Sequence, residues 1–151
     1  MPGMTNTGKS FMLNYFQGVA APVFAVALCT GDTVATAGTL TLANLTQVPQ
    51  ENGYTAGAVQ LTPGTTDFDV RTQDGASSKA YVQVKDITWT ASGGSIPSSG
   101  NGALYAVLTE ATTAVTTNRA VFAYFSLSTG RSVSSGQTLT VQDMTINALD
   151  S

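Results

Sequence analysis

The chain has 151 residues, enough for one domain with its own hydrophobic core, and only 10% of them are charged. A net charge of −3 and six scattered basic residues exclude the basic surface that nucleic-acid-binding proteins need, so we expect no nucleic-acid partner. The sequence has no histidine and one cysteine, which removes histidine-based catalytic triads, the usual zinc sites and intrachain disulfides.

Threonine, serine, glycine and alanine are frequent where lysine and glutamate are usual, a bias that favours strands and turns. A free monomer generally depends on surface charge to stay soluble. We therefore expect partners to cover much of this surface.

Residues 1–9 are polar and are interpreted as a flexible leader before a single domain at residues 10–151. The leader matches the phosphate-loop pattern G-x-x-x-x-G-K-S from Gly3 to Ser10. That motif binds phosphate only when a buried strand precedes it and a helix follows. Only two residues precede Gly3, so we interpret the match as fortuitous and expect no nucleotide or other cofactor.

A short helix is expected from Ser10, which can cap it, to Gly18, which can end it. The helix would either cover an open end of a β-sheet core or anchor the chain to a neighbouring subunit. In the second case its four large apolar side chains, spaced as i,i+4 pairs, form a partner-binding site: Phe11, Met12, Tyr15 and Phe16.

The apolar tract between this helix and Cys29 is interrupted by asparagine, glutamine, glycine and proline. We therefore expect neither a membrane span nor a targeting signal. Cys29 itself lies in an apolar run and is expected to be a buried small hydrophobic residue.

Short apolar runs separated by glycine and proline follow along the rest of the chain. Such spacing is typical of an all-β protein, an antiparallel β-sandwich or jelly roll of about eight strands. The expected strands are residues 23–30, 54–62, 80–84, 87–91, 103–108, 119–127 and 138–148, with a weak edge strand or loop at 34–43. The strand at 119–127 has aromatic residues on both faces, which implies that both faces are covered.

The segment from Lys79 to Glu110 is the centre of this pattern, and its first strand changes phase. Apolar residues fall on even numbers up to Val84 and on odd numbers from Ile87 through Trp89, which we expect to be the largest side chain of the core. The same change occurs after Val141. We predict a β-bulge in both strands, with Asp86 and Asp143 accepting hydrogen bonds from local backbone N–H groups.

The remaining carboxylates predict no catalytic or metal site. Asp67, Asp69 and Asp74 resemble part of a calcium loop, but the terminal glutamate and the alternating ligands are missing, so a solvated loop is expected. Asp86 and Asp143 have no base beside them, and the chain is not expected to be an enzyme.

Several motifs together suggest a family. They are the helix Phe11–Phe16 with Gly18, the strand ending Leu28-Cys29-Thr30, Asn52-Gly53-Tyr54, Asp86–Ala91 with the glycine-rich loop to Ala103, Gly130–Val133, and Gly136–Leu139. From Phe11 onward this order resembles small virion structural proteins of tailed bacteriophages. The resemblance implies a capsid decoration (cement) protein, often a trimer, on the outer surface of the virion. Such a protein bridges and stabilises subunits of the major capsid protein.

Two other functions are compatible with the sequence. The chain can instead be a tail, collar or fibre-attachment protein, which resembles the first class closely. It can also be a carbohydrate-binding module, for which the exposed aromatic platform would come from Tyr81, Trp89, Tyr105 and Tyr124. Each of these residues lies in an apolar strand, so packing within the core or an interface is the favoured interpretation.

Overall fold

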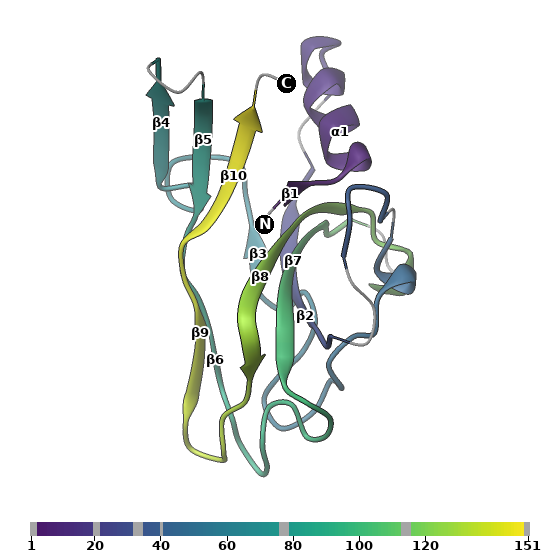
Figure 1. The fold of residues 1–151 in the computed structure, drawn as a ribbon, viewed down its shortest axis with the longest axis vertical. Coiled ribbons are helices and arrows are strands. Elements are labelled where there is room, and N and C mark those ends of the chain that lie inside the picture. The colour runs from purple at the N-terminus through teal and green to yellow at the C-terminus, as the bar shows by residue number, and fades with distance from the viewer. Residues whose placement is uncertain are drawn as a thin grey trace.

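The computed structural model describes residues 3–19, 22–31, 35–39, 41–75, 79–112 and 116–149. These residues form a mostly β structure with one α-helix, α1 (Asn6–Phe16), and two short 3-10 helices, η1 (Leu42–Asn44) and η2 (Thr116–Asn118) (Figure 1). The strands are β1 (Gly3–Met4), β2 (Phe24–Cys29), β3 (Gln60–Leu61), β4 (Val70–Asp74), β5 (Lys79–Val84), β6 (Ile87–Thr90), β7 (Ala103–Glu110), β8 (Val121–Arg131), β9 (Thr138–Val141) and β10 (Met144–Leu149).

The strands of the described residues form three antiparallel sheets. Their orders are β1-β8-β7-β2-β3, β10-β5-β4 and β6-β9. Every residue of β2 is buried, and so is all of β7 except Leu104. Both strands are interior strands of the largest sheet, which explains why their sequences are nearly continuous apolar runs rather than alternating ones. The mostly β class with one short N-terminal helix is thereby confirmed.

Side chains from all three sheets meet in one buried cluster. Trp89 is 4% exposed and contacts Tyr54 edge-to-face, with ring centroids 5.7 Å apart. The Tyr54 hydroxyl oxygen accepts a hydrogen bond from the Leu28 backbone N–H at 2.7 Å. Trp89 of β6 therefore packs through Tyr54 against β2, so it has the core position expected from the sequence.

The second and third sheets continue one another as a long two-stranded ribbon, β5–β6 against β9–β10. The pairs Val84–Met144 and Ile87–Val141 flank its interruption, with two unpaired residues on each strand. The register is unchanged across this gap. The expected change of phase is present, but it is a symmetric interruption and not a one-sided bulge.

The hydrogen bonds expected from local backbone N–H groups to the carboxylates at the interruption are not formed. Glutamine side chains donate to these carboxylates instead. Gln83 Nε2 donates to Asp143 Oδ1 at 3.3 Å, and Gln142 Nε2 donates to Asp86 Oδ2 at 3.0 Å. Each aspartate is thus bonded by a glutamine of the opposite strand. These two side-chain bonds join the strands where the backbone ladder is missing.

The N-terminal residues differ from the expected flexible leader. Gly3 and Met4 pair with β8, and α1 begins at Asn6, four residues before the expected start. The reason is the buried Thr5, whose Oγ1 accepts a hydrogen bond from the Gly8 N–H at 3.0 Å and so caps the helix. The pairing and the cap therefore attach residues 3–9 to the sheet.

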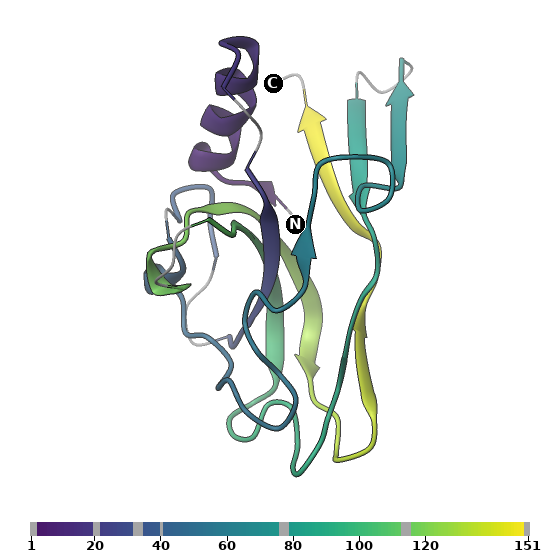
Figure 2. The ribbon, with the colours of Figure 1, turned by 180° about the vertical axis from the view of Figure 1, so that it is seen from behind.

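Three other segments also differ from expectation. Of the strand expected at 54–62, only the two residues of β3 form a strand. β4 forms where a solvated loop is expected, and residues 42–44, part of the expected edge strand or loop, form η1. Figures 1 and 2 show that α1 and the sheet β10-β5-β4 stand at the same end of the molecule, whereas β6 and β9 extend toward the other end. No helix among the described residues is long and apolar enough to cross a membrane.

Candidate partner-binding site

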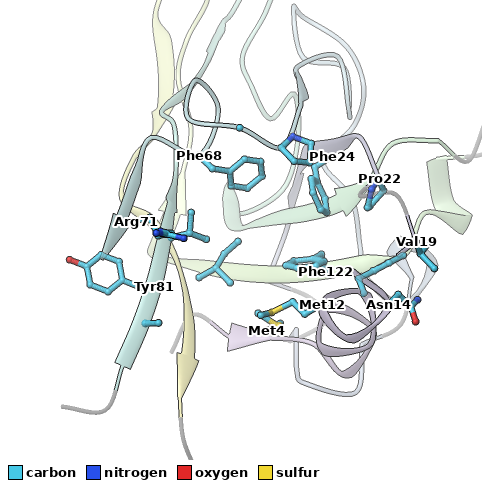
Figure 3. Close-up of a pocket in the computed structure, with 16 residues that line it drawn as sticks. Met4, Met12, Asn14, Val19, Pro22, Phe24, Phe68, Arg71, Tyr81 and Phe122 are labelled. Carbon is cyan, nitrogen blue, oxygen red and sulfur yellow. The ribbon is translucent and has the colours of Figure 1, made fainter. Parts of the chain in front are cut away.

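An open groove of about 530 Å³ lies at the end of the molecule that carries α1. It is bounded by α1 and β1 on one side and by the sheet β10-β5-β4 on the other, with β2 and β8 contributing to its floor. Most of its lining side chains are apolar. Phe24, Phe68 and Phe122 point toward one another across it, and Met4 and Met12 lie beside Phe122 (Figure 3).

Four aromatic rings form a continuous row along this groove. Phe11 of α1 stacks on Phe122 with centroids 6.2 Å apart, Phe122 contacts Phe24 edge-to-face at 5.1 Å, and Phe24 contacts Phe68 at 5.7 Å. The row connects the helix, two strands of the largest sheet and the loop before β4. Both faces of β8 were predicted to be covered, and α1 covers part of the face that carries Phe122.

The polar side chains of the groove are few. They are Asn14 of α1, Tyr81 of β5 and Arg71 of β4. Arg71 is exposed and has no hydrogen-bond or ion-pair partner among the side chains that the structure describes. Among the described residues that line the groove none is acidic, so their charge is that of one arginine at an apolar surface.

The four residues predicted to bind a partner have different positions. Phe11 is half-buried against Phe122, so it holds α1 in place. Met12 lines the groove and is 41% exposed, and Phe16 is 84% exposed but does not line it. The Tyr15 side chain lies outside the described part of the structure. The structure therefore brings Phe11 and Met12 to the groove and leaves Phe16 in solvent.

Three further exposed apolar residues were missed by the sequence analysis. They are Leu13, Val19 and Val70, with exposed fractions of 65%, 53% and 39%. Leu13 and Phe16 are i,i+3 neighbours on the helix surface, a spacing that would have grouped Leu13 with the predicted residues. Val70 belongs to β4, which was expected to be a loop. With Met12 and Phe16 they make up all the large exposed apolar side chains of the described residues, and all five lie on α1, just after it, or on β4.

The phosphate-loop match has a structural explanation. Residues 6–9 are the first turn of α1, and several N–H groups at this end already donate to protein oxygens. The Thr5 N–H donates to Phe122 O at 3.0 Å, the Asn6 N–H to Ala37 O at 2.8 Å and the Gly8 N–H to Thr5 Oγ1 at 3.0 Å. A Cβ at Gly8 would lie 2.2 Å from Phe122 O. The second glycine of the pattern thus allows α1 to approach β8 closely.

The charged loop before β4 is organised by Asp67. Its carboxylate forms an ion pair with Lys85 and accepts a hydrogen bond from the Thr62 N–H at 2.8 Å. The hydrogen bond from Lys85 and that from Thr62 hold the pKa of Asp67 below its usual range. This carboxylate is therefore a structural link. Among the described residues, no group of three or more potential ligands could hold a metal ion.

Two other groups singled out in the sequence are buried. Cys29 is fully buried, and burial raises the pKa of its thiol to about 12, so its reactive thiolate is scarce at neutral pH. Of the aromatic residues considered for a sugar platform, Trp89 and Tyr105 are buried and Tyr81 and Tyr124 are half-buried. Trp89 and Tyr105 offer no open face on which a sugar could stack.

Comparison with protein-family models, with curated proteins and with solved structures finds no match for this chain. The geometry of the site therefore carries the functional argument. An open apolar groove beside exposed apolar side chains is suited to the docking of another apolar surface.

Proposed function

We propose that this chain is a structural protein of a bacteriophage virion, specifically a capsid decoration protein that joins its assembly through the apolar end of the molecule. The observation that carries the proposal is the concentration of exposed Met12, Leu13, Phe16, Val19 and Val70 at that end. Large apolar areas left exposed on a soluble chain mark interaction sites. Permanent interfaces are also more apolar than transient ones.

The resemblance of the sequence to small virion structural proteins of tailed bacteriophages is the reason for proposing the virion as the location and the major capsid protein as the partner. A decoration protein binds at many equivalent positions on a lattice, where effective concentration strengthens individually weak contacts. A charged fraction of 10% suits a chain whose surface is largely covered in its working state. We also propose that the five-stranded sheet and the β5–β6/β9–β10 ribbon, which share one buried cluster, form the two layers of a β-sandwich.

The test is the copy number of the protein in purified particles, measured by quantitative mass spectrometry against the major capsid protein. A fixed fraction of the capsid lattice, such as one copy per capsid subunit, is the expected result. A handful of copies per particle would replace decoration by a tail, collar or fibre-attachment role. Absence from particles would overturn the virion proposal.

A pair of variants tests the site itself. Leu13→Gln with Phe16→Gln removes two exposed apolar side chains from α1 without touching Phe11, and is expected to reduce incorporation into particles at least tenfold. Lys9→Gln with Ser10→Gln changes two exposed polar positions of the same helix and is the matched control. Wild-type occupancy of both variants would show that the apolar end is not the docking surface.

A further inference from the structure

We infer that the groove is occupied by a second copy of this chain: the ridge of α1, defined as Leu13 and Phe16, enters the groove of the next copy in a head-to-tail ring. The inference rests on the proposed function, because it names a partner for the same apolar end.

The ridge and the groove of one copy lie on different sides of α1. Phe11 points to β8, where it stacks on Phe122. At 3.6 residues per turn, Leu13 is about 200° and Phe16 about 140° around the helix axis from Phe11. Neither residue lines the groove. The ridge therefore cannot fill the groove of its own chain, and only another molecule can bring a ridge to it.

The groove has the size and chemistry to accept the ridge. An apolar cavity of about 150 Å³ accommodates a benzene ring, so the groove of about 530 Å³ has room for both Leu13 and Phe16. The row of aromatic rings along it presents an apolar wall to these side chains. One contact would remove both the exposed ridge and the exposed groove from water.

The charges of the two surfaces are complementary. Arg71 lines the groove and has no acidic partner among the described side chains. At the end of α1, Asn14 O accepts hydrogen bonds from the Gln17 and Val19 N–H groups at 2.9 and 3.2 Å. The last turn has no basic residue, so no cationic side chain of that turn offsets the partial negative charge of its terminal carbonyl groups. Phe16 is the last residue of the helix, so its insertion would bring this end of α1 to the Arg71 of the neighbouring copy.

A second copy would cover more of the exposed apolar surface than a small ligand would. A single-chain amphiphile with a carboxylate head could place its tail in the groove and its head at Arg71. It would leave Leu13 and Phe16 in water, whereas a second copy covers them. A contact between two different patches is heterologous, and such contacts repeat from copy to copy until a ring closes.

The experiment measures the mass of the full chain in solution by light scattering after size exclusion, over a range of concentrations. The wild type is expected to be a single closed oligomer. The ridge variant, Leu13→Gln with Phe16→Gln, is expected to be monomeric. So is a groove variant, Ala80→Glu, which places a carboxylate at an exposed position of β5 that lines the groove.

Mixing the two variants tests the contact between copies directly. The groove variant keeps its ridge and the ridge variant keeps its groove, so an equimolar mixture is expected to form a dimer that cannot extend into a ring. Lys9→Gln with Ser10→Gln on α1 and Thr88→Glu on the exposed side of β6 are the controls, and both are expected to remain oligomeric. Circular dichroism of each variant checks that it is folded.

Three results would overturn the inference: a monomeric wild type, a ridge variant with the wild-type mass, or a mixture that stays monomeric. A monomeric wild type that binds a fluorescent fatty acid would assign the groove to an amphiphile. A chain that is monomeric but present in particles would refute this inference alone. A ring-forming chain that is absent from particles would refute the virion proposal and leave the ring intact.

Discussion

Phe11 and Phe16 are the same type of residue in the same helix, yet they have opposite roles. Phe11 stacks on Phe122 and holds α1 against β8, whereas Phe16 is 84% exposed. The i,i+4 spacing that grouped them with Met12 and Tyr15 shows which side chains are neighbours along the helix. It does not show which side faces the protein, so one predicted site separates into a structural contact at Phe11 and an exposed side chain at Phe16.

Asp67 joins parts of the chain that lie apart in the sequence. It pairs with Lys85, accepts the Thr62 N–H at 2.8 Å through its side chain, and accepts the Lys85 N–H at 3.0 Å through its backbone oxygen. The loop before β4 is thereby attached to the ribbon at its interruption. The charged form of the carboxylate is the form that makes these side-chain bonds.

This pairing predicts a pH dependence. Because the folded-state pKa of Asp67 is depressed, its contribution to the free energy of unfolding is complete above the unfolded pKa and is lost as the pH falls below about 4. Asp67→Asn should lower the free energy of unfolding at pH 7 by about 0.5–1 kcal/mol, the range for a partly exposed pair. The same substitution should lower it less at pH 3.

Urea unfolding at pH 7 and pH 3 measures this difference, with the exposed Asp69→Asn as the matched control. An equal decrease in stability at the two pH values would show that the Asp67 charge does not stabilise the fold.

At the scale of the element, α1 depends on a close approach between its first turn and β8. A Cβ at Gly8 would meet Phe122 O at 2.2 Å, and backbone oxygen cannot move aside as a flexible side chain can. Thr5 is fully buried between the two elements, and its Oγ1 hydroxyl lies within hydrogen-bond distance of both Val121 O and Phe122 O. The start of the helix is therefore set by packing on the sheet.

The substitution Gly8→Ala tests whether packing against β8 or helix propensity has the larger effect on stability at this position. Alanine favours a helix interior by about 1 kcal/mol over glycine, so an isolated helix would be stabilised. Here we expect a net destabilisation of about 1–3 kcal/mol, because the added methyl overpacks the contact with Phe122. Chemical denaturation measures it, and Gly75→Ala, where a Cβ would meet nothing within 4 Å, is the control. A Gly8→Ala variant more stable than the wild type would mean that α1 is not held this closely.

The ribbon shows how an element can change face without losing register. Val84 and Ile87 are both buried although they lie three residues apart, a spacing that puts side chains on opposite faces of a regular strand. The two unpaired residues on each strand absorb this change. The bonds of Gln83 to Asp143 and of Gln142 to Asp86 replace part of the missing ladder.

At the scale of the whole molecule, the proposed ring predicts that the stability of the fold depends on association between copies. A ring that binds only folded copies stabilises them by mass action. A tenfold increase in protein concentration should therefore raise the midpoint of thermal unfolding by about 3 °C, because unfolding of a subunit must also separate it from its neighbour. Differential scanning calorimetry at two concentrations measures the shift. The Leu13→Gln/Phe16→Gln variant should show none, and an equal shift in that variant would place the interface elsewhere.

The sequence by itself determined the features that depend on local pattern. Alternation and turn residues identified the mostly β class, the core position of Trp89 and the change of phase at Lys85-Asp86. They also identified the strands expected at 23–30 and 103–108, which form as the buried strands β2 and β7. These follow because the period of a strand and the burial of a large apolar side chain are properties of a short segment. The low charge also led us to expect a surface covered by partners, and this stays a prediction.

Only the tertiary structure decided the start of α1, the existence of β4, and the groove between them. Thr5 and Gly8 act through Phe122, more than 110 residues away in the chain, and the exposed Val70 lies on β4, a strand that the sequence did not predict. The division of α1 into a packed side and an exposed ridge depends on which neighbour covers the helix. Such contacts join distant segments, and local periodicity contains no information about which segments will meet.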